Sequence, residues 1–261
     1  MEVIFLGTGT SQGVPMVAHK GTGLDLGDRR NWRSRASIHV TLGGTHVQVD
    51  AGPEFRMQCL DNDVTAVDFL ILTHEHSDHV TGMDDLRRFC DLRDGAAIPV
   101  FSTDAGLERV RTMFPYALRK ENRGTGYAAF DLHAMPPVLG LPDGSTIRST
   151  LLPHGRTRTL GLVFEEKGTG ARLAYYTDCK MVTPEAVELA RGAEVVVLDG
   201  LRPTEHPTHM SIHEAADAAK AIGAARSFIT HTTWQIDYAT WAPRLAAMGL
   251  EIACDRLRLA L

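Results

Sequence analysis

The sequence has few cysteines and no pairing pattern among them. Its 261 residues include only four, Cys59, Cys90, Cys179 and Cys254, and no two of them form a Cys-x-x-Cys pair. Isolated cysteines indicate neither a disulfide framework nor a cysteine zinc cluster. We therefore expect reduced thiols, most of them buried.

The sequence also lacks a long apolar run. No window approaches the roughly 18 uninterrupted apolar residues that a membrane helix needs. The chain enters its first apolar segment, Val3 to Leu6, without the basic region or cleavage site typical of a signal peptide. Together these absences predict a cytoplasmic protein with no membrane partner.

Positive charge is not in excess. The chain carries 27 Lys plus Arg against 32 Asp plus Glu, a formal net charge of -5. This balance excludes a globally basic nucleic-acid binder, although a local basic patch or bound cations could still attract a phosphate. With 44% hydrophobic and 23% charged residues, the composition is that of a globular protein. The length fits one domain over residues 1–261.

Apolar segments rich in β-branched residues alternate with helix-like stretches. Strands are predicted at 3–6, 38–42, 46–49, 69–72, 98–101, 160–165, 173–176, 195–198 and 228–229, and helices at 83–90, 105–114, 184–191, 212–221 and 240–248. Thr183 and Ser211 precede two of these helices and are N-cap candidates. The class is therefore mixed α and β (α/β or α+β), with two sheets. Residues 16–36 and 117–145 are the least regular stretches, which favours functional loops there.

The strongest motif is Thr73-His74-Glu75-His76-Ser77-Asp78-His79, directly after the apolar run 69–72. A strand that ends there places His74 and His76 on one side if the extended conformation continues, and Asp78 and His79 follow as the chain turns. Imidazole and carboxylate groups suit zinc, manganese or iron(II). Crowding four such groups at one strand end predicts a metal site, whereas the alternative, a polar loop with surface histidines, needs no ion.

Three further candidate ligands stand at the ends of other apolar segments. They are His154, Asp178 and His231. A single histidine at a strand end is usually only a satisfied polar residue. Together with the first cluster, however, the chain offers seven ligand-type residues, the number that two metal ions need when one carboxylate bridges them.

The arrangement of His74, His76, Asp78 and His79 resembles the His-x-His-x-Asp-His signature of the metallo-β-lactamase superfamily. The resemblance runs over essentially the whole chain, from Phe5-Leu6-Gly7-Thr8-Gly9-Thr10-Ser11-Gln12-Gly13-Val14-Pro15 through Val49-Asp50-Ala51-Gly52 to Ile229-Thr230-His231. The opening stretch and residues 208–212 look most like the phosphodiesterase branch of PhnP-like proteins, and ribonuclease Z is more distant. The resemblance implies a four-layer αββα sandwich with a dinuclear site along one edge of the sheets.

The resemblance also implies a role for each residue of the site. The expected metal ligands are His74, His76 and His154 for one ion, Asp78, His79 and His231 for the second, and Asp178 as the bridge. His209 matches a histidine near the scissile phosphate that is proposed to donate a proton to the leaving oxygen. Asp50 matches an aspartate that orients a ligand histidine. Asp199 either orients a histidine in a similar way or caps a turn.

The chain departs from the PhnP-like pattern at two places. Residues 16–36 contain no cysteine, so the additional structural zinc of those proteins is not expected here. Trp234 stands where many relatives have another histidine, which predicts changed substrate contacts. Arg156 and Arg158 follow His154 closely and either bind a substrate phosphate or lie in a solvated loop.

Four arginines gather in a short stretch near the N-terminus. Arg29, Arg30, Arg33 and Arg35, together with Trp32, predict a solvated or intersubunit surface, and a nucleic-acid patch is the less favoured alternative. A homodimer is therefore left open as a partner arrangement, and a nucleic-acid partner is not expected.

The sequence thus predicts a metal-dependent phosphodiesterase that acts on a small or cyclic phosphodiester, with two divalent ions, zinc or manganese, as cofactors. The ions would lower the pKa of a bound water and so supply hydroxide at neutral pH. Asp78 would orient this nucleophile, and His209 would protonate the departing alkoxide. The alternatives are a lactonase, a thioesterase or a transfer-RNA 3′ endonuclease on the same site, or a non-catalytic metal-binding scaffold. The endonuclease would need an extended basic arm, and no long insertion of that kind is visible.

Overall fold

The structure is a computed structural model that describes residues 1–19, 23–118 and 126–261. Its strands are β1 (Glu2–Gly7), β2 (Ser37–Leu42), β3 (Thr45–Val49), β4 (Phe69–Leu72), β5 (Ile98–Ser102), β6 (Phe130–Ala134), β7 (Val138–Gly140), β8 (Thr146–His154), β9 (Thr157–Glu165), β10 (Arg172–Tyr176), β11 (Val195–Asp199), β12 (Arg226–Thr230), β13 (Glu251–Ile252) and β14 (Arg258–Ala260). Its α-helices are α1 (Phe55–Asp61), α2 (Ser77–Val80), α3 (Arg87–Asp91), α4 (Asp104–Met113), α5 (Pro184–Ala190), α6 (Ile212–Ile222) and α7 (Tyr238–Ala246). Short 3-10 helices are η1 (Arg29–Asn31), η2 (Met83–Leu86) and η3 (Pro115–Leu118).

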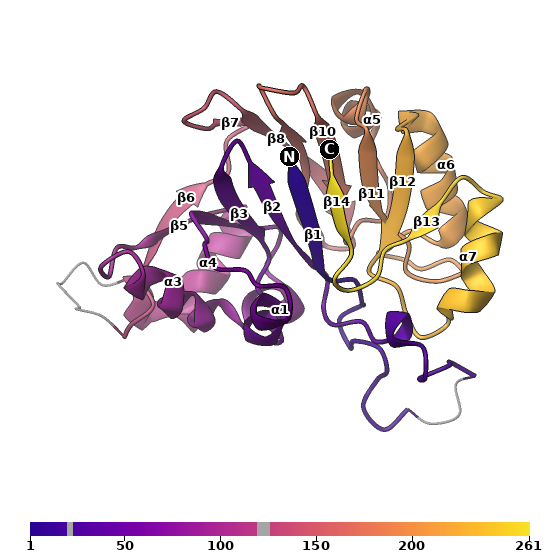
Figure 1. The fold of residues 1–261 in the computed structure, drawn as a ribbon, viewed down its shortest axis with the longest axis horizontal. Helices are drawn as coiled ribbons and strands as arrows, with labels where there is room; N and C mark the ends of the chain where they lie inside the picture. The colour runs from indigo at the N-terminus through magenta and orange to yellow at the C-terminus, as the bar shows by residue number, and fades with distance from the viewer. Residues whose placement is uncertain (20–22, 119–125) are drawn as a thin grey trace.

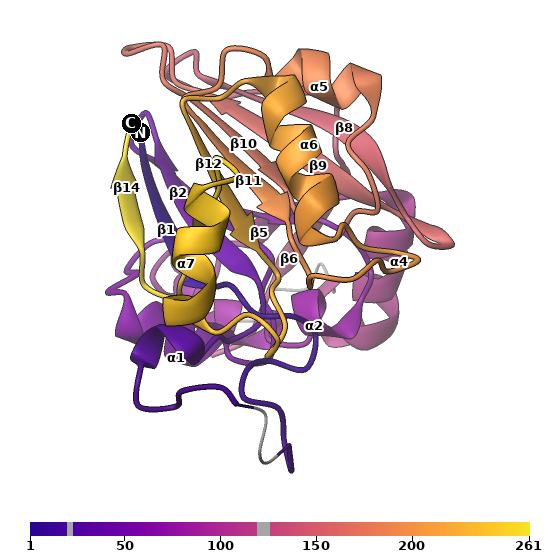
Figure 2. The same cartoon turned by 90° about the vertical axis from the view of Figure 1, so that its right-hand side faces the viewer.

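Two seven-stranded sheets pack face to face. The first has the order β14-β1-β2-β3-β4-β5-β6, and the second has the order β13-β12-β11-β10-β9-β8-β7. Helices α5, α6 and α7 cover the outer face of the second sheet, and α1, α3 and α4 lie on the side of the first (Figure 1; Figure 2). The four-layer αββα sandwich expected from the sequence is therefore confirmed.

Strand β4 illustrates why its sequence is apolar throughout. Phe69 and Ile71 point into the core between the two sheets, whereas Leu70 and Leu72 pack against the outer helices. All four side chains are buried because helices cover the outer face of the sheet. An apolar strand without alternation is typical of a sheet that is covered on both sides.

Local signals fix the ends of two helices as predicted. Thr183 accepts a hydrogen bond from the backbone N–H of Ala186 and caps α5, with Pro184 at the first helical position. Ser211 caps α6 and forms a reciprocal capping box with Glu214. Both N-cap predictions are confirmed.

Several element predictions were incomplete or wrong. The stretch 117–145 contains strands β6 and β7, and the helix expected at 83–90 is the 3-10 helix η2 followed by the short helix α3. Helix α1 was not predicted at all. Residues 20–22 and 119–125, which belong to the two stretches expected to be functional loops, lie outside the described residues.

The topology brings many strand ends to one edge of the sandwich. Strands β10, β11 and β12 run parallel, as do β3 and β4, so their carboxyl ends meet at that edge. The predicted ligands lie at this shared edge.

No helix in the described part of the chain has the length and apolar character to span a membrane.

Candidate metal centre

The seven predicted ligands converge at this edge of the sandwich. His74 follows β4, and Asp78 and His79 belong to the short helix α2 just beyond it. From the second sheet, His154 ends β8, Asp178 lies just after β10, and His231 follows β12. Except for His76, which is exposed, the histidines of this set are at most 4% exposed.

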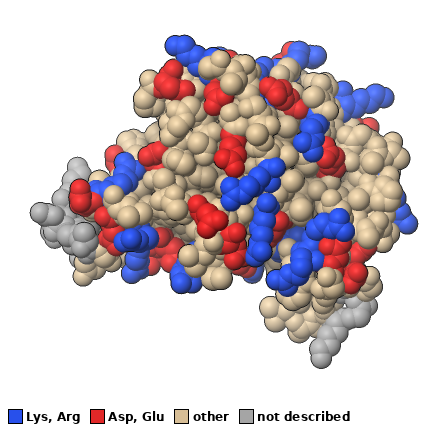
Figure 3. Space-filling model, viewed as in Figure 1, with Lys and Arg blue, Asp and Glu red and all other residues tan. Residues whose placement is uncertain are grey.

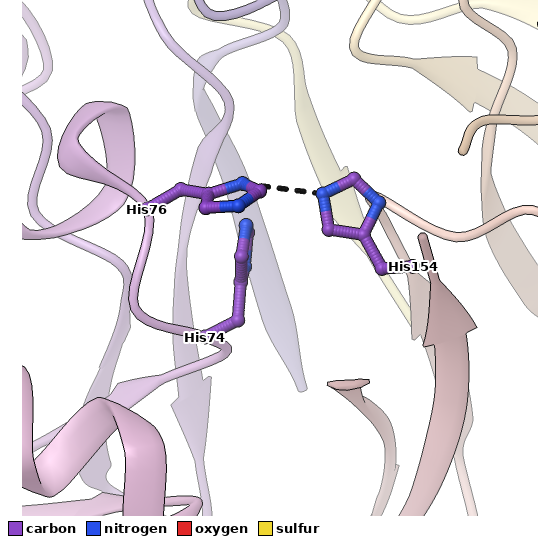
Figure 4. A group of neighbouring side chains, drawn as sticks. All are labelled: His74, His76 and His154. Carbon is purple, nitrogen blue, oxygen red and sulfur yellow. Dashed lines mark hydrogen bonds between the residues drawn. The ribbon is translucent and has the colours of Figure 1, made fainter. Parts of the chain in front are cut away.

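His74, His76 and His154 form a first group of three imidazoles. One nitrogen of each ring lies within 4.8 Å of the others. Nδ1 of His76 and Nε2 of His154 are 3.2 Å apart, although the two residues come from opposite sheets (Figure 4). Three neutral imidazoles around one point are a typical zinc donor set.

The second group contains Asp78, His79, Asp178 and His231, again with one donor atom each within 4.8 Å of the others. Nε2 of His79 lies 3.2 Å from Oδ2 of Asp78 and 3.3 Å from Oδ2 of Asp178. Nε2 of His231 lies 3.0 Å from the same Asp178 oxygen. This mixed oxygen and nitrogen set suits zinc or manganese.

Asp178 lies between the two groups. Its Oδ2 is 3.0 Å from His231 in the second group and 4.0 Å from Nε2 of His74 in the first. A carboxylate in this position can contact an ion on either side. The bridging role implied by the resemblance is compatible with this geometry and stays a prediction.

Three residues of this edge have left-handed backbone conformations. The φ angles are 60° at Asp50, 51° at Asp178 and 59° at His231. A residue other than glycine in this region costs about 1–3 kcal/mol, and such strain gathers at functional sites. The surrounding sheets hold these turns in place and thereby aim the side chains at one another.

Asp50 orients two of the candidate ligand histidines. It is fully buried, and its Oδ2 accepts a hydrogen bond from Nδ1 of His79 at 2.7 Å. The Thr73 hydroxyl donates to Asp50 and lies 3.0 Å from Nδ1 of His74. Both rings therefore present Nε2 to the cluster. This agrees with the role predicted for Asp50 and adds Thr73, which the sequence analysis did not single out.

The backbone orients a third ligand. Nδ1 of His154 donates to the carbonyl oxygen of Thr208 at 3.0 Å. This contact links the end of β8 to the loop before α6 and leaves Nε2 of His154 for the cluster. A backbone carbonyl carries no side-chain signal, so the sequence could not reveal this contact.

Unpartnered polar atoms indicate that these residues fit a cation. Nε2 of His74, His79 and His231 are buried and make no hydrogen bond within residues 1–19, 23–118 and 126–261. Each buried polar atom without a partner costs about 1–3 kcal/mol. Coordination to divalent ions would satisfy all three.

The electrostatics of the two groups differ in a way that also fits bound cations. Burial lowers the pKa of His74, and the nearby His79 lowers it further, which favours the neutral imidazole that binds metals. At His231, burial opposes a positive charge, yet Asp178 raises the pKa to about 10. The carboxylates of the second group therefore attract positive charge strongly.

His209 faces the same cluster and is held by a buried carboxylate. Its ring lies parallel to that of His231 at 4.8 Å and edge-on to that of His154 at 4.7 Å. Its Nδ1 lies 2.6 Å from Oδ2 of Asp199, a side chain with no exposed surface. Asp199 therefore orients a histidine, and the same oxygen also accepts a hydrogen bond from the backbone N–H of Cys179, so both roles that the sequence left open have a contact in the structure. The other ring nitrogen, Nε2, remains for the cavity that His209 lines.

The cavity beside the cluster has a volume of about 580 Å³. Arg156, in the turn before β9, lines it, whereas Arg158, the second residue of β9, is exposed and does not. Trp234 packs edge-on against His19 at 4.7 Å and does not line it either. Ser11 does line the cavity, together with Glu75, Thr157 and Thr208, and none of these four was predicted.

The arginine cluster near the N-terminus is only partly a surface. Arg29 and Arg30 are exposed, but Arg33 is 1% exposed. Its guanidinium donates to the Thr232 hydroxyl and to backbone carbonyls of the loop after His231. The prediction that Arg33 belongs to a surface patch is therefore wrong, because neutral oxygen acceptors hold this side chain inside the fold.

Comparison with known proteins agrees with the fold and the site. The profile of the beta-lactamase superfamily domain matches residues 45–232, well over half of the chain. The chain belongs to the beta-lactamase superfamily. The matched region contains the whole series of candidate ligands from His74 to His231.

Similar proteins include hydrolases of phosphate esters and anhydrides. A diphosphatase of the PhnP family has 27% identical residues and a TM-score of 0.87, covering 100% of this chain and 97% of that one. Ribonuclease Z of Methanopyrus kandleri is 26% identical over 239 residues, which are 78% of this chain and 83% of that protein. This superfamily member is therefore a hydrolase, as predicted.

A further relative has a different activity. An octanoyltransferase of Porphyromonas gingivalis is 33% identical over 234 residues, or 88% of this chain. The matched part is 46% of that protein, so the chain spans less than half of its length.

Proposed function

We propose that this protein hydrolyses a small or cyclic phosphodiester with two divalent ions, zinc or manganese, held by the seven ligands. The observation that carries the proposal is the pair of His209 and Asp199. His209 lines the cavity beside both ligand groups, and its 2.6 Å contact with buried Asp199 holds the ring in one orientation. A histidine in this position suits general acid catalysis near neutral pH.

The ions would lower the pKa of water and neutralise negative charge on the phosphoryl oxygens. Asp78 accepts a hydrogen bond from the attacking water and orients it. Burial opposes ionisation of Asp78, but His79 and His231 lower its pKa, so the carboxylate is available as an acceptor at neutral pH. The water loses one proton to solvent as its oxygen bonds to phosphorus, and the bond from phosphorus to the leaving oxygen breaks. That oxygen takes the proton from Nε2 of His209, and solvent returns a proton to the imidazole.

Arg156 supports an anionic substrate. It lines the same cavity as Asp78 and His209, is exposed there, and has no ion pair with a residue of the described ranges 1–19, 23–118 and 126–261. A guanidinium can bind a phosphate through two parallel hydrogen bonds. The cavity of about 580 Å³ is open and accommodates a nucleotide-sized or smaller substrate. Arg158 and Trp234 do not line this cavity, so we propose that they contact only substrates that extend beyond it.

Diphosphate hydrolysis is a second candidate, because the PhnP-family neighbour is a diphosphatase. The two reactions share the attack of water on phosphorus but differ in the leaving group. A phosphate leaves more easily than an alkoxide and depends less on protonation. The two candidates therefore predict different effects of removing His209.

The test compares His209→Ala with wild type at equal metal loading. On a phosphodiester with a poor alkoxide leaving group, we expect a loss of about 10² to 10⁴ in kcat, the usual contribution of general acid catalysis. The loss should shrink on bis(p-nitrophenyl) phosphate, because p-nitrophenolate departs without protonation. His213→Ala is the matched control, since this histidine of α6 is exposed and does not line the cavity.

The same enzyme preparations decide between substrate classes. A panel of cyclic nucleotides, other cyclic phosphodiesters, a diphosphate, a lactone and an acyl thioester should give the highest kcat/KM with a phosphodiester. A higher value with the diphosphate would favour the second candidate. A higher value with the lactone or the thioester would reject phosphodiester hydrolysis, and an equal His209→Ala loss for all leaving groups would reject the proton-donor role.

A further inference from the structure

Glu75 lines the cavity of the candidate metal centre but belongs to neither ligand group. The carboxylates that line this cavity come from Glu75, Asp78 and Asp178. Oδ2 of Asp78 and Oδ2 of Asp178 lie 3.2 Å and 3.3 Å from Nε2 of His79, within the second group. Among the described residues, no group of donor atoms close enough to hold one ion includes Glu75. The metal centre therefore leaves this carboxylate without a role.

One oxygen of the Glu75 carboxylate is held in place and the other has no partner. Oε1 accepts a hydrogen bond from the Thr157 hydroxyl at 2.5 Å, a contact that joins the loop after β4 to the start of β9. The backbone carbonyl of Glu75 accepts a hydrogen bond from Nε of Arg109 on α4 at 3.1 Å. Oε2 is buried and has no hydrogen-bond partner within residues 1–19, 23–118 and 126–261. The side chain is thus fixed with one acceptor oxygen left for a ligand.

Arg156 places the opposite charge beside the same cavity. It directly precedes Thr157, the partner of Glu75, in the turn before β9. Its guanidinium is exposed and forms no ion pair with Glu75 or with another carboxylate of the described residues. The cavity therefore presents two opposite charges that do not neutralise each other, an arrangement that favours a ligand with both charges.

Glu75 works against a substrate that carries only negative charge. A phosphodiester is an anion, and a carboxylate in the same cavity repels it. On the face of the molecule in Figure 3, basic and acidic side chains are interspersed, so no broad basic region on that face offsets the repulsion. A hydroxyl group on the substrate would donate to Oε2 but leave the repulsion in place. An ammonium group both donates to Oε2 and cancels the repulsion.

We infer that Glu75 determines substrate specificity: its Oε2 accepts a hydrogen bond from a primary ammonium group of the substrate, while Arg156 binds the phosphate. The preferred substrate is then a zwitterionic phosphodiester with an amine in its alcohol part. The cavity of about 580 Å³ has room for both groups beside the candidate ligands. This inference rests on the proposed function, so its test includes a measurement of binding that does not depend on hydrolysis.

The first test compares three p-nitrophenyl phosphodiesters whose second alcohol is aminopropyl, hydroxypropyl or butyl. The three esters share one leaving group and differ only at the end of the chain. For metal-loaded wild type, kcat/KM should be at least about 10-fold higher for the aminopropyl ester than for the other two, as expected for a hydrogen bond between charged groups. The difference should lie mainly in KM, because the ammonium contact is the same in the bound substrate and in the transition state.

Glu75→Gln keeps the length of the side chain and an acceptor for Thr157 but removes the charge, so it should abolish the preference. Glu108→Gln is the matched control and should keep it, since Glu108 is an exposed residue of α4 that does not line the cavity. The preference is a ratio within one protein, so a change in folding or metal content does not imitate its loss. Equal kcat/KM for the aminopropyl and butyl esters in wild type, an equal preference for the hydroxypropyl ester, or a preference that survives in Glu75→Gln would overturn the inference.

A second test separates this inference from the proposed function. Aminopropyl and butyl methylphosphonate carry the same negative charge as the phosphodiesters, and calorimetry measures their binding to the metal-loaded protein. The aminopropyl compound should bind wild type at least about 10-fold more tightly than the butyl compound, whereas Glu75→Gln should bind both equally. Equal affinities in wild type would overturn the inference whether or not the esters are hydrolysed. The expected preference in binding, without hydrolysis of any of the three esters, would reject the proposed function and support ammonium recognition by Glu75.

Discussion

The contact between Asp199 and His209 leads to a graded prediction. Oδ2 of Asp199 accepts hydrogen bonds both from Nδ1 of His209, at 2.6 Å, and from the backbone N–H of Cys179, at 3.0 Å. In Asp199→Asn, the amide oxygen can take the place of Oδ2 and keep both bonds. The variant therefore loses the negative charge but not the orientation of the ring, whereas Asp199→Ala loses both.

The expected magnitudes follow from this difference. A hydrogen bond to a charged group contributes about 1.5–3 kcal/mol and a neutral one about 0.5–1.5 kcal/mol. The loss of charge alone is thus worth about 1–1.5 kcal/mol, which is about a 5- to 10-fold decrease in rate at about 1.4 kcal/mol per factor of ten. The loss of the whole bond in Asp199→Ala corresponds to about 10- to 150-fold.

The assay is kcat for a phosphodiester with a poor leaving group, with metal content measured for each variant. The metal control is needed because Cys179 adjoins the candidate ligand Asp178, so a displaced backbone could mimic a loss of proton donation. Both decreases should be smaller on bis(p-nitrophenyl) phosphate. Equal kcat values for wild type, Asp199→Asn and Asp199→Ala at full metal loading would refute the reasoning.

Two further predictions concern the ligands and the core. Asp178→Asn should weaken binding of both ions, at least one of them about 100-fold, measured by calorimetric titration of the metal-free protein, because its Oδ2 lies 3.0 Å from His231 of the second group and 4.0 Å from His74 of the first; unchanged stoichiometry and affinity would contradict a ligand role. Burial lowers the pKa of His39, 3% exposed in the first sheet, from 6.5 to about 4. The folded state favours neutral His39, so protonation of this residue in the unfolded state destabilises the fold as the pH falls from 6.5 toward 4. The free energy of unfolding decreases by about 3 kcal/mol over this range. Urea unfolding at pH 7 and pH 4.5 should therefore show a smaller decrease in the free energy of unfolding for metal-free His39→Gln than for metal-free wild type. Equal decreases would contradict the role of His39.

Local sequence alone predicts most strands of the first sheet and the candidate ligands His74, His76, Asp78 and His79. The apolar run 69–72 and the motif that follows it predict both β4 and its ligands, because strand, turn and ligands are contiguous in the chain. The positions of His154, Asp178 and His231 follow the same rule of a polar residue at a strand end. Only the family resemblance predicted that these residues converge, because spacing along the chain does not show which strand ends meet in space.

Short and partly exposed elements could not be predicted in the same way. Helix α1 has only seven residues, and it is stabilised by packing of Phe55 and Cys59 rather than by its own sequence. Strand β7 has three residues at the edge of its sheet, and none of them is buried. Such elements depend on tertiary contacts that have no periodic signal.

Contacts between loops were the least predictable part of the site. Asp199 ends β11 and meets His209 only because the loop before α6 folds back over the strand end. Arg33 lies in a run of arginines that is typical of a solvated surface, yet it is buried against the loop after His231. Both contacts join segments whose distance in space the sequence does not encode locally.

The central claim is that two ions held by these seven residues support phosphodiester hydrolysis. The most direct measurement titrates the metal-free protein with zinc or manganese while bis(p-nitrophenyl) phosphate hydrolysis is followed at a fixed protein concentration. The account predicts that activity rises until about two equivalents are bound and is lost again with a chelator. Full activity with less than half an equivalent of bound metal would contradict it.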